Sequence, residues 1–136
     1  RTMKVFFFFF IIIDIIDTDR INNKKAVALM QNLMRKQDTI VISEDSISTL
    51  YYNLRHSQQK QLILLNFLEV ITQKWCVSPF GIEGIKKAIK YSKNSNSDLE
   101  DALQYFCADK EGCEVIYTSD KNFPKIAIAI KDYDEN

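Results

Sequence analysis

The sequence predicts a three-layer α/β/α fold with a parallel central sheet of four to five strands wrapped by helices. Short apolar or β-branched runs alternate with longer segments of helical period along the chain, as they do in such sheets. Residues 5–13 are apolar without interruption, which is typical of a strand buried on both faces. With 136 residues, 3 Gly and 2 Pro, we expect a single domain with a substantial core and little disorder.

The expected elements follow in order from the N-terminus. A strand over residues 4–10 leads into a short helical segment at 11–16. Apolar periodicity predicts a helix over 22–35, and β-branched residues predict a second strand at 39–42. Helices are expected at about 47–54 and from 58 to about 73, the second of them with Leu62, Leu65, Leu68 and Ile71 facing inward. Further strands are expected at 74–77, 115–118 and 126–130, with helices starting near 82 and 97 between them.

Charge and glycine content weigh against several binding functions. The chain has 18 basic and 18 acidic residues, so it has no overall electrostatic footprint for nucleic acid, although a local patch is enough. One expected helix has a basic face that is either simply solvated or able to meet RNA phosphates: Lys86, Lys87, Lys90 and Lys93. Three glycines cannot form a Gly-rich phosphate-binding loop.

The cysteines and the N-terminal apolar run bear on the cellular location of the protein. Cys76, Cys107 and Cys113 contain no CxxC pair, so we expect buried, reduced thiols and a cytoplasmic protein. The apolar run of nine residues is far shorter than the roughly 20 needed to span a bilayer, and no small-residue cleavage site follows it. We expect one domain over residues 1–136, with Arg1 and Thr2 ahead of the domain proper.

Two acidic segments carry the chemistry of the chain. Ser97 and Glu100 fit a capping box at a helix start, and the helix dipole favours Asp98 in the first turn. Asp101 lies one position beyond this box and is not required for capping. Asp120 follows a strand directly, and ligands of open α/β sheets bind beyond the carboxyl ends of strands. Carboxylates that meet at such an edge suit Mg²⁺, which takes oxygen ligands.

These segments, DLEDALQ at 98–104 and TSDKNF at 118–123, resemble the two C-terminal acidic motifs of PIN domains, the ribonuclease fold of VapC-type toxins. The resemblance also covers GCEVI at 112–116, the segment from 42 to 55 and KKA at 24–26. It implies a toxin–antitoxin endoribonuclease that cleaves RNA phosphodiesters with Mg²⁺ or Mn²⁺, a homodimer, and an antitoxin protein as partner. It also implies that Asp101 and Asp120 are catalytic metal ligands, that Asp98 is a further catalytic acid, and that the Thr118 hydroxyl orients the Asp120 loop.

The sequence departs from the family pattern at two acidic positions. The Asp-x-Asn motif at the end of the first strand falls on Phe8 and Phe10, and the glutamate of the central helix falls on Thr49. These losses predict weak metal binding and impaired activity. A rival register, with the motif at residues 17–19, leaves too few residues before the helix expected at 22.

Three further acids are candidates for accessory roles. Asp45 precedes Thr49 by four residues and shares its helical face, so Asp45 or Glu44 can lean toward the site. The competing interpretation is that both acids only serve the helix N-terminus. Asp14 fits the short helix after the first motif, where the family often has an acid.

Two alternatives differ in class from a ribonuclease. A non-catalytic PIN-like binding or scaffold protein would leave RNA intact in the presence of metal. A receiver domain of two-component signalling shares the size and the alternation of elements, but it needs an acidic pair where residues 8–10 are phenylalanine. His56, the single histidine, is expected to have a surface or capping role.

Overall fold

The computed structural model describes residues 1–135. Its strands are β1 (Lys4–Phe7), β2 (Thr39–Ser43), β3 (Cys76–Ser78), β4 (Val115–Tyr117) and β5 (Ala129–Lys131). Its helices are α1 (Phe9–Ile16), α2 (Asn23–Arg35), α3 (Asp45–Asn53), α4 (Gln58–Ile71), α5 (Ile82–Ser95), α6 (Leu99–Lys110) and the 3₁₀ turn η1 (Tyr133–Glu135).

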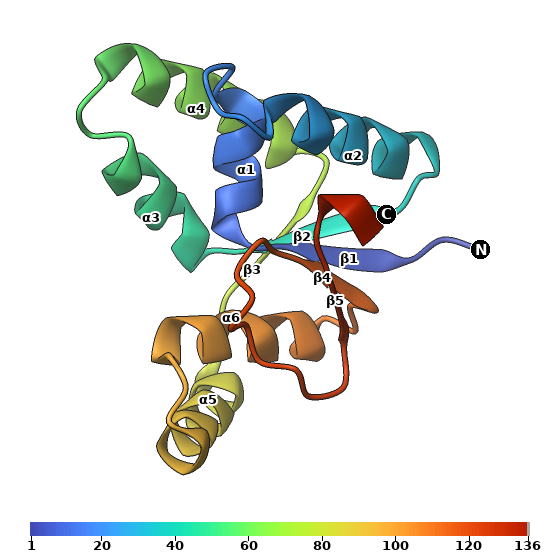
Figure 1. Cartoon of the computed structure of the whole chain (residues 1–136), viewed down its shortest axis with the longest axis vertical. Coiled ribbons are helices and arrows are strands. Elements are labelled where there is room, and N and C mark those ends of the chain that lie inside the picture. Colours follow the sequence, from blue (N-terminus) through green and yellow to red (C-terminus); the bar gives the residue numbers. More distant parts are fainter. Residues whose placement is uncertain (136) are drawn as a thin grey trace.

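The strands form one parallel sheet in the order β3-β2-β1-β4-β5. Helices α1 to α4 lie on one side of the sheet, and α5 and α6 lie on the other (Figure 1). The predicted three-layer α/β/α fold with its parallel sheet is therefore confirmed. No helix within residues 1–135 is long and apolar enough to cross a membrane.

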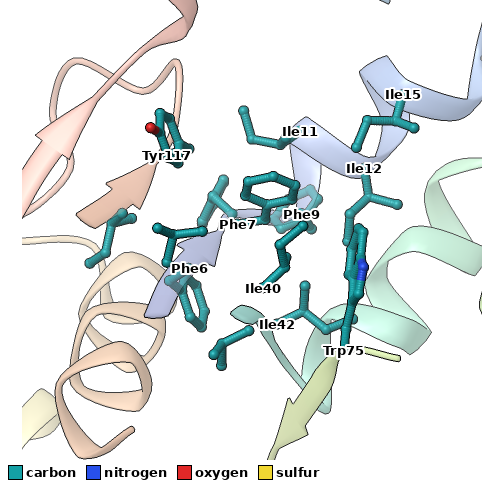
Figure 2. Close-up of a cluster of buried hydrophobic side chains, with 14 of the residues drawn as sticks. Phe6, Phe7, Phe9, Ile11, Ile12, Ile15, Ile40, Ile42, Trp75 and Tyr117 are labelled. Atoms are coloured by element: carbon teal, nitrogen blue, oxygen red, sulfur yellow. The ribbon is translucent and has the colours of Figure 1, made fainter. Parts of the chain in front are cut away.

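The core is built around the central strand β1. Its apolar side chains Val5, Phe6 and Phe7 are fully buried, because β1 has a strand on each side and helices on both faces. Phe7 lies between Trp75 and Tyr117 (Figure 2), with ring centroids 5.6 and 6.0 Å away in edge-to-face geometry. Such aromatic pairs add about 0.5–1.5 kcal/mol beyond the area that they bury.

The first strand is shorter than its apolar run. Phe8 is extended (φ −66°, ψ 148°), and α1 begins at Phe9, so the expected strand over 4–10 is wrong at its end. Phe8 still donates its N–H to the Tyr117 carbonyl at 3.1 Å. Because β4 ends at Tyr117, the residues after Phe8 have no strand partner on that side, and helical hydrogen bonds satisfy their backbone instead.

The inward face of α4 also differs from the prediction. Leu62 and Leu65 are exposed, and the buried residues are Leu64, Leu68 and Ile71. This helix is apolar on much of its circumference, so two sets of residues could face inward. The predicted set starts at Leu62 with a spacing of three, and the buried set starts at Leu64 with spacings of four and three. The neighbouring helices α1 and α3 select the second set.

Candidate functional site

Two carboxyl groups meet at the carboxyl edge of the sheet. Asp101 lies in the first turn of α6 and is 8% exposed, while Asp120 lies in the loop that follows β4. The carboxyl of Asp101 is hydrogen-bonded to that of Asp120. The structure thus brings together the two acids that the sequence singled out, although 19 positions separate them along the chain.

Burial and the bond to Asp120 set the protonation of this pair. Burial, then the hydrogen bond and charge of Asp120, then the charges of Asp98 and Glu100 raise the pKa of Asp101 to about 8. Two carboxylates this close cannot both ionise without strong repulsion. At neutral pH these causes together favour the protonated form of Asp101.

Asp98 caps the helix that carries Asp101. Its side chain accepts the Asp101 N–H at 3.1 Å, and α6 begins at Leu99. The capping box predicted at Ser97 and Glu100 is therefore wrong by one residue, because Asp98 is the last extended residue before the helix. The cap uses one oxygen of Asp98, fixes the turn under Asp101 and adds negative charge beside the pair.

The loop that carries Asp120 is fixed by three hydrogen bonds. Thr118 Oγ1 accepts the Asp120 N–H at 3.0 Å, as a residue that orients this loop would. Asp120 Oδ1 accepts the Asn122 N–H at 2.9 Å, and the Phe123 N–H donates to the Asp120 carbonyl at 3.2 Å. Asp120 is thus held in place by its own turn, independently of Asp101.

An aromatic wall stands where the first family motif would supply acids. Phe8 is 3% exposed, and its ring packs edge-on against Phe123 at 5.5 Å. The bond from the Phe8 N–H to the Tyr117 carbonyl places this wall beside the strand that leads to Asp120. Phe10, in the same aromatic cluster, has its ring centroid 6.0 Å from that of Phe8. Neither side chain can donate an oxygen to a metal ion.

No carboxylate replaces the glutamate that the family pattern has at Thr49. Thr49 is half-buried, and its hydroxyl donates to the Asp45 carbonyl at 3.3 Å. The Asp45 side chain is exposed, but its charge, after burial and the charge of Asp98, contributes to raising the pKa of Glu100. Asp45 is therefore near enough to the start of α6 for its charge to act on Glu100.

The start of α3 is capped without its acids. Ser43 Oγ accepts the Ser46 N–H at 3.1 Å, whereas Glu44 makes no side-chain cap. The exposed Glu44 is anchored instead through its backbone, which donates to the Ser78 carbonyl at 2.8 Å. Its carboxylate has no structural partner among residues 1–135.

Asp14 is buried and hydrogen-bonded to residues outside the acid pair. It is 3% exposed and accepts hydrogen bonds from Arg20 Nε and the Tyr133 hydroxyl. Burial, followed by the bond to Asp14, raises the pKa of Tyr133. These bonds join α1 to the C-terminal turn η1, so Asp14 holds the fold together at the position where an accessory acid was predicted.

The acids of the rival motif at residues 17–19 form ion pairs with Lys60 of α4. Asp17 accepts a hydrogen bond from Lys60 Nζ of α4 at 2.9 Å. Burial pushes the pKa of Asp17 upward, but the bonds to Lys60 and to the Asp19 backbone outweigh it, and the pKa is lowered. The expected surface position of His56 is observed: it is exposed and lines a cavity of about 280 Å³ together with Lys60.

The site offers only two carboxylates as ligands for a divalent cation. Among residues 1–135, no three His, Cys, Asp or Glu side chains come close enough to hold a metal ion. The two carboxylates of Asp101 and Asp120 can hold one Mg²⁺ when water and a substrate phosphate complete its shell. A preformed two-metal centre does not fit these residues.

The family sequence model described as "PIN domain" matches residues 11–129. The chain belongs to the PIN domain family. It is 36% identical over 127 residues to "Ribonuclease VapC1" of Aquifex aeolicus (strain VF5), which covers 88% of this chain and 83% of that protein.

Solved PIN-like structures share the fold at low sequence identity. The toxin VapC20 of Mycobacterium tuberculosis superposes with a TM-score of 0.71 at 12% identity, over 88% of this chain and 92% of that chain. FitAcB from Neisseria gonorrhoeae has a TM-score of 0.73 at 16% identity, over 95% and 97%. At this identity the similarity concerns the fold alone.

Sequence reasoning missed two residues that shape this PIN domain site. Phe123 closes the aromatic wall, and its place three residues after Asp120 in a turn was the available signal. The Tyr105 hydroxyl accepts the N–H groups of Ala127 and Ile128 at 2.9 and 3.0 Å. It thereby holds the segment that returns from the Asp120 loop to β5, and no local pattern points to such a contact.

Proposed function

We propose that this PIN domain is a toxin-type endoribonuclease whose centre is reduced to the Asp101–Asp120 pair and whose activity is impaired. The pair supports this function, because it meets at the carboxyl edge of the sheet in a chain 36% identical to a protein named "Ribonuclease VapC1". The substrate is RNA, and the cofactor is Mg²⁺ or Mn²⁺, bound weakly. Asp98 is a third, accessory acid.

The residues of the chain divide the work as follows. Asp101 and Asp120 would hold the cation at the scissile phosphate, and Asp98 and Thr118 position them through the backbone bonds described above. A bound divalent ion supplies charge neutralisation and lowers the pKa of an attacking water. The proton of the pair competes with the cation, so cation affinity rises with pH until it levels off near pH 8, the pKa of Asp101.

The proposal includes partners known for proteins of similar fold. VapBC2 from Rickettsia felis, bound to a DNA fragment from its promoter, has a TM-score of 0.69 at 17% identity, over 96% of this chain and 98% of that chain. By analogy we propose an antitoxin protein and a homodimer for this chain. The exposed apolar side chains Leu62, Leu65 and Val70 of α4 give such partners a surface. The free thiols Cys76, Cys107 and Cys113 support a cytoplasmic location.

Cleavage of RNA tests this function. The purified protein, with and without millimolar Mg²⁺ or Mn²⁺, is incubated with total RNA and a labelled single strand. We expect slow cleavage that requires metal and is lost in Asp101→Asn. Asp109→Asn, an exposed acid at the far end of the same helix, is the matched control and keeps wild-type activity. Equal cleavage by the Asp101→Asn variant would show that the activity comes from elsewhere.

The aromatic wall favours a second candidate, a non-catalytic PIN domain that binds a partner. Phe8 and Phe123 fill the place of the first motif, and a buried apolar wall needs no metal to be stable. Restoring an acid separates the two candidates. If wild type leaves RNA intact at high metal while Phe8→Asp binds Mn²⁺ and cleaves, the natural chain is the non-catalytic member.

A further inference from the structure

A polar cavity of about 230 Å³ lies directly beside Asp120, between the ends of β4 and β5 and the turn η1. Its lining includes three lysines and two hydroxyl side chains, Lys121, Lys125, Lys131, Thr118 and Ser119. Asp120 itself forms part of the wall, so the cavity adjoins one of the two acids of the pair.

The acids of this cavity accept hydrogen bonds, whereas its lysines form no ion pair within residues 1–135. Asp120 is bonded to Asp101. Asp132 Oδ1 accepts the Asp134 N–H at 2.9 Å, and Glu135 Oε1 accepts the Asp132 N–H at 3.4 Å. These two acids thus stabilise the C-terminal turn.

Within residues 1–135, no carboxylate lies within 4.0 Å of Lys121, Lys125 or Lys131. Other cations near the helices, Lys25 and Lys60 among them, do have such partners. Lys131 is moreover only partly exposed. The wall of the cavity also carries Asp120, Asp132 and Glu135, but none of these acids lies within ion-pair distance of the three lysines, which can therefore turn to an anion that enters the cavity.

A polyanionic strand needs positive charge next to an acidic centre. The carboxylates at Asp101, Asp98 and Glu100 repel an approaching RNA backbone, and a cation at the pair cancels this repulsion only locally. We propose that Lys121, Lys125 and Lys131 bind a backbone phosphate of RNA adjacent to the phosphodiester held at Asp101–Asp120. This inference rests on the proposed function, because it takes RNA as the ligand of the site.

The lysines of α5 provide a comparison surface with the same number of charges. Lys86, Lys90 and Lys93 flank a shallow hollow on that helix, which no residue of the acid pair lines. In Figure 1, α5 lies beyond α6 as seen from the sheet. None of these three lysines lines the cavity beside Asp120, so they serve as the control with the same number of charges.

Binding of a fluorescein-labelled, unstructured 12-nucleotide RNA, followed by anisotropy in EDTA, tests the assignment without cleavage. The triple variant K121Q/K125Q/K131Q is compared with K86Q/K90Q/K93Q, after thermal melts show that both are folded. Each phosphate contact on a single strand contributes about 0.7 to the slope of log affinity against log salt. Because the three lysines share one phosphate, we expect the first variant to lower the slope by about 0.7 and the affinity at low salt by roughly tenfold, on that same relation. The second variant should change neither, and K121R/K125R/K131R should restore both.

Several results would overturn the assignment. These are wild-type protein that does not bind the RNA, an α5 variant that loses as much slope as the cavity variant, or polyglutamate that displaces RNA at equal charge concentration. The ribonuclease function and this site fail separately. A wild type that never cleaves but binds through these lysines refutes only the former, and a cleaving cavity variant with unchanged RNA affinity refutes only the latter.

Discussion

Replacing Asp101 by asparagine should change how the stability of the domain depends on pH. In the folded state the pKa of Asp101 is raised from 3.8 to about 8 by burial and by Asp120. The folded state therefore binds one proton more than the unfolded state between about pH 4 and pH 8. By linkage, the free energy of unfolding falls as pH rises through this window. Asparagine resembles the protonated acid and does not titrate, so the variant should escape this loss.

The size of the effect follows from the width of the window. Each pKa unit corresponds to 1.36 kcal/mol, so a window of about four units sets an upper limit near 6 kcal/mol. The pair titrates jointly and the site can relax when charged, so we expect about 2–4 kcal/mol. For a domain of this size, 1 kcal/mol corresponds to roughly 4 °C in Tm. Relative to wild type, Asp101→Asn should therefore gain roughly 10 °C between pH 4 and pH 9.

Thermal melts monitored by circular dichroism in EDTA measure this difference in Tm. The melts run from about pH 4 to pH 9, which spans the window in which Asp101 titrates. Asp109→Asn, which removes an exposed carboxylate from the same helix, should run parallel to wild type over this range. Asp120→Asn should flatten only part of the wild-type slope, because it removes the bond and charge of Asp120 but leaves the burial of Asp101, the larger cause of its raised pKa. Parallel Tm curves for wild type and Asp101→Asn would refute the shared proton and the geometry from which it was inferred.

Three further substitutions test the surroundings of the pair. Tyr105→Phe removes the hydroxyl that accepts two backbone N–H groups and should cost about 1–2 kcal/mol in urea unfolding; an unchanged midpoint would contradict these bonds. Gln104→Met should raise the stability by about 1–2 kcal/mol, because the Gln104 amide is 1% exposed and has no hydrogen-bond partner within residues 1–135. Asp98→Ala removes the cap of α6 and should cost about 0.5–2 kcal/mol, while Asp98→Asn should cost little; equal losses in both would argue against capping.

Local patterns were sufficient for the order of elements and for the two acidic segments. Helical and strand periods placed most elements within a few residues, because each period arises from one face of one element. The segments DLEDALQ and TSDKNF were informative by themselves, since both the helix start and the turn after a strand are local structures. The family and the parallel sheet followed from these features.

Faces and partners depended on contacts between distant segments. The same apolar residues of α4 allow two stripes, and packing against α1 and α3 decided that Leu64 rather than Leu62 or Leu65 is buried. The helix start moved from Ser97 to Asp98 because the cap must reach the N–H of Asp101. Sequence spacing alone does not distinguish an N-cap at residue 97 from one at residue 98.

The sequence by itself predicted that Asp101 and Asp120 come together and that Phe8 and Thr49 stand where the family pattern has acids. Only the tertiary structure decided that the two carboxyls share a hydrogen bond, that Phe8 packs on Phe123, and that Lys131 joins Lys121 beside them. The physical reason is that a side chain's protonation and partners depend on what the fold places against it, and these neighbours come from strands and loops far apart in the chain.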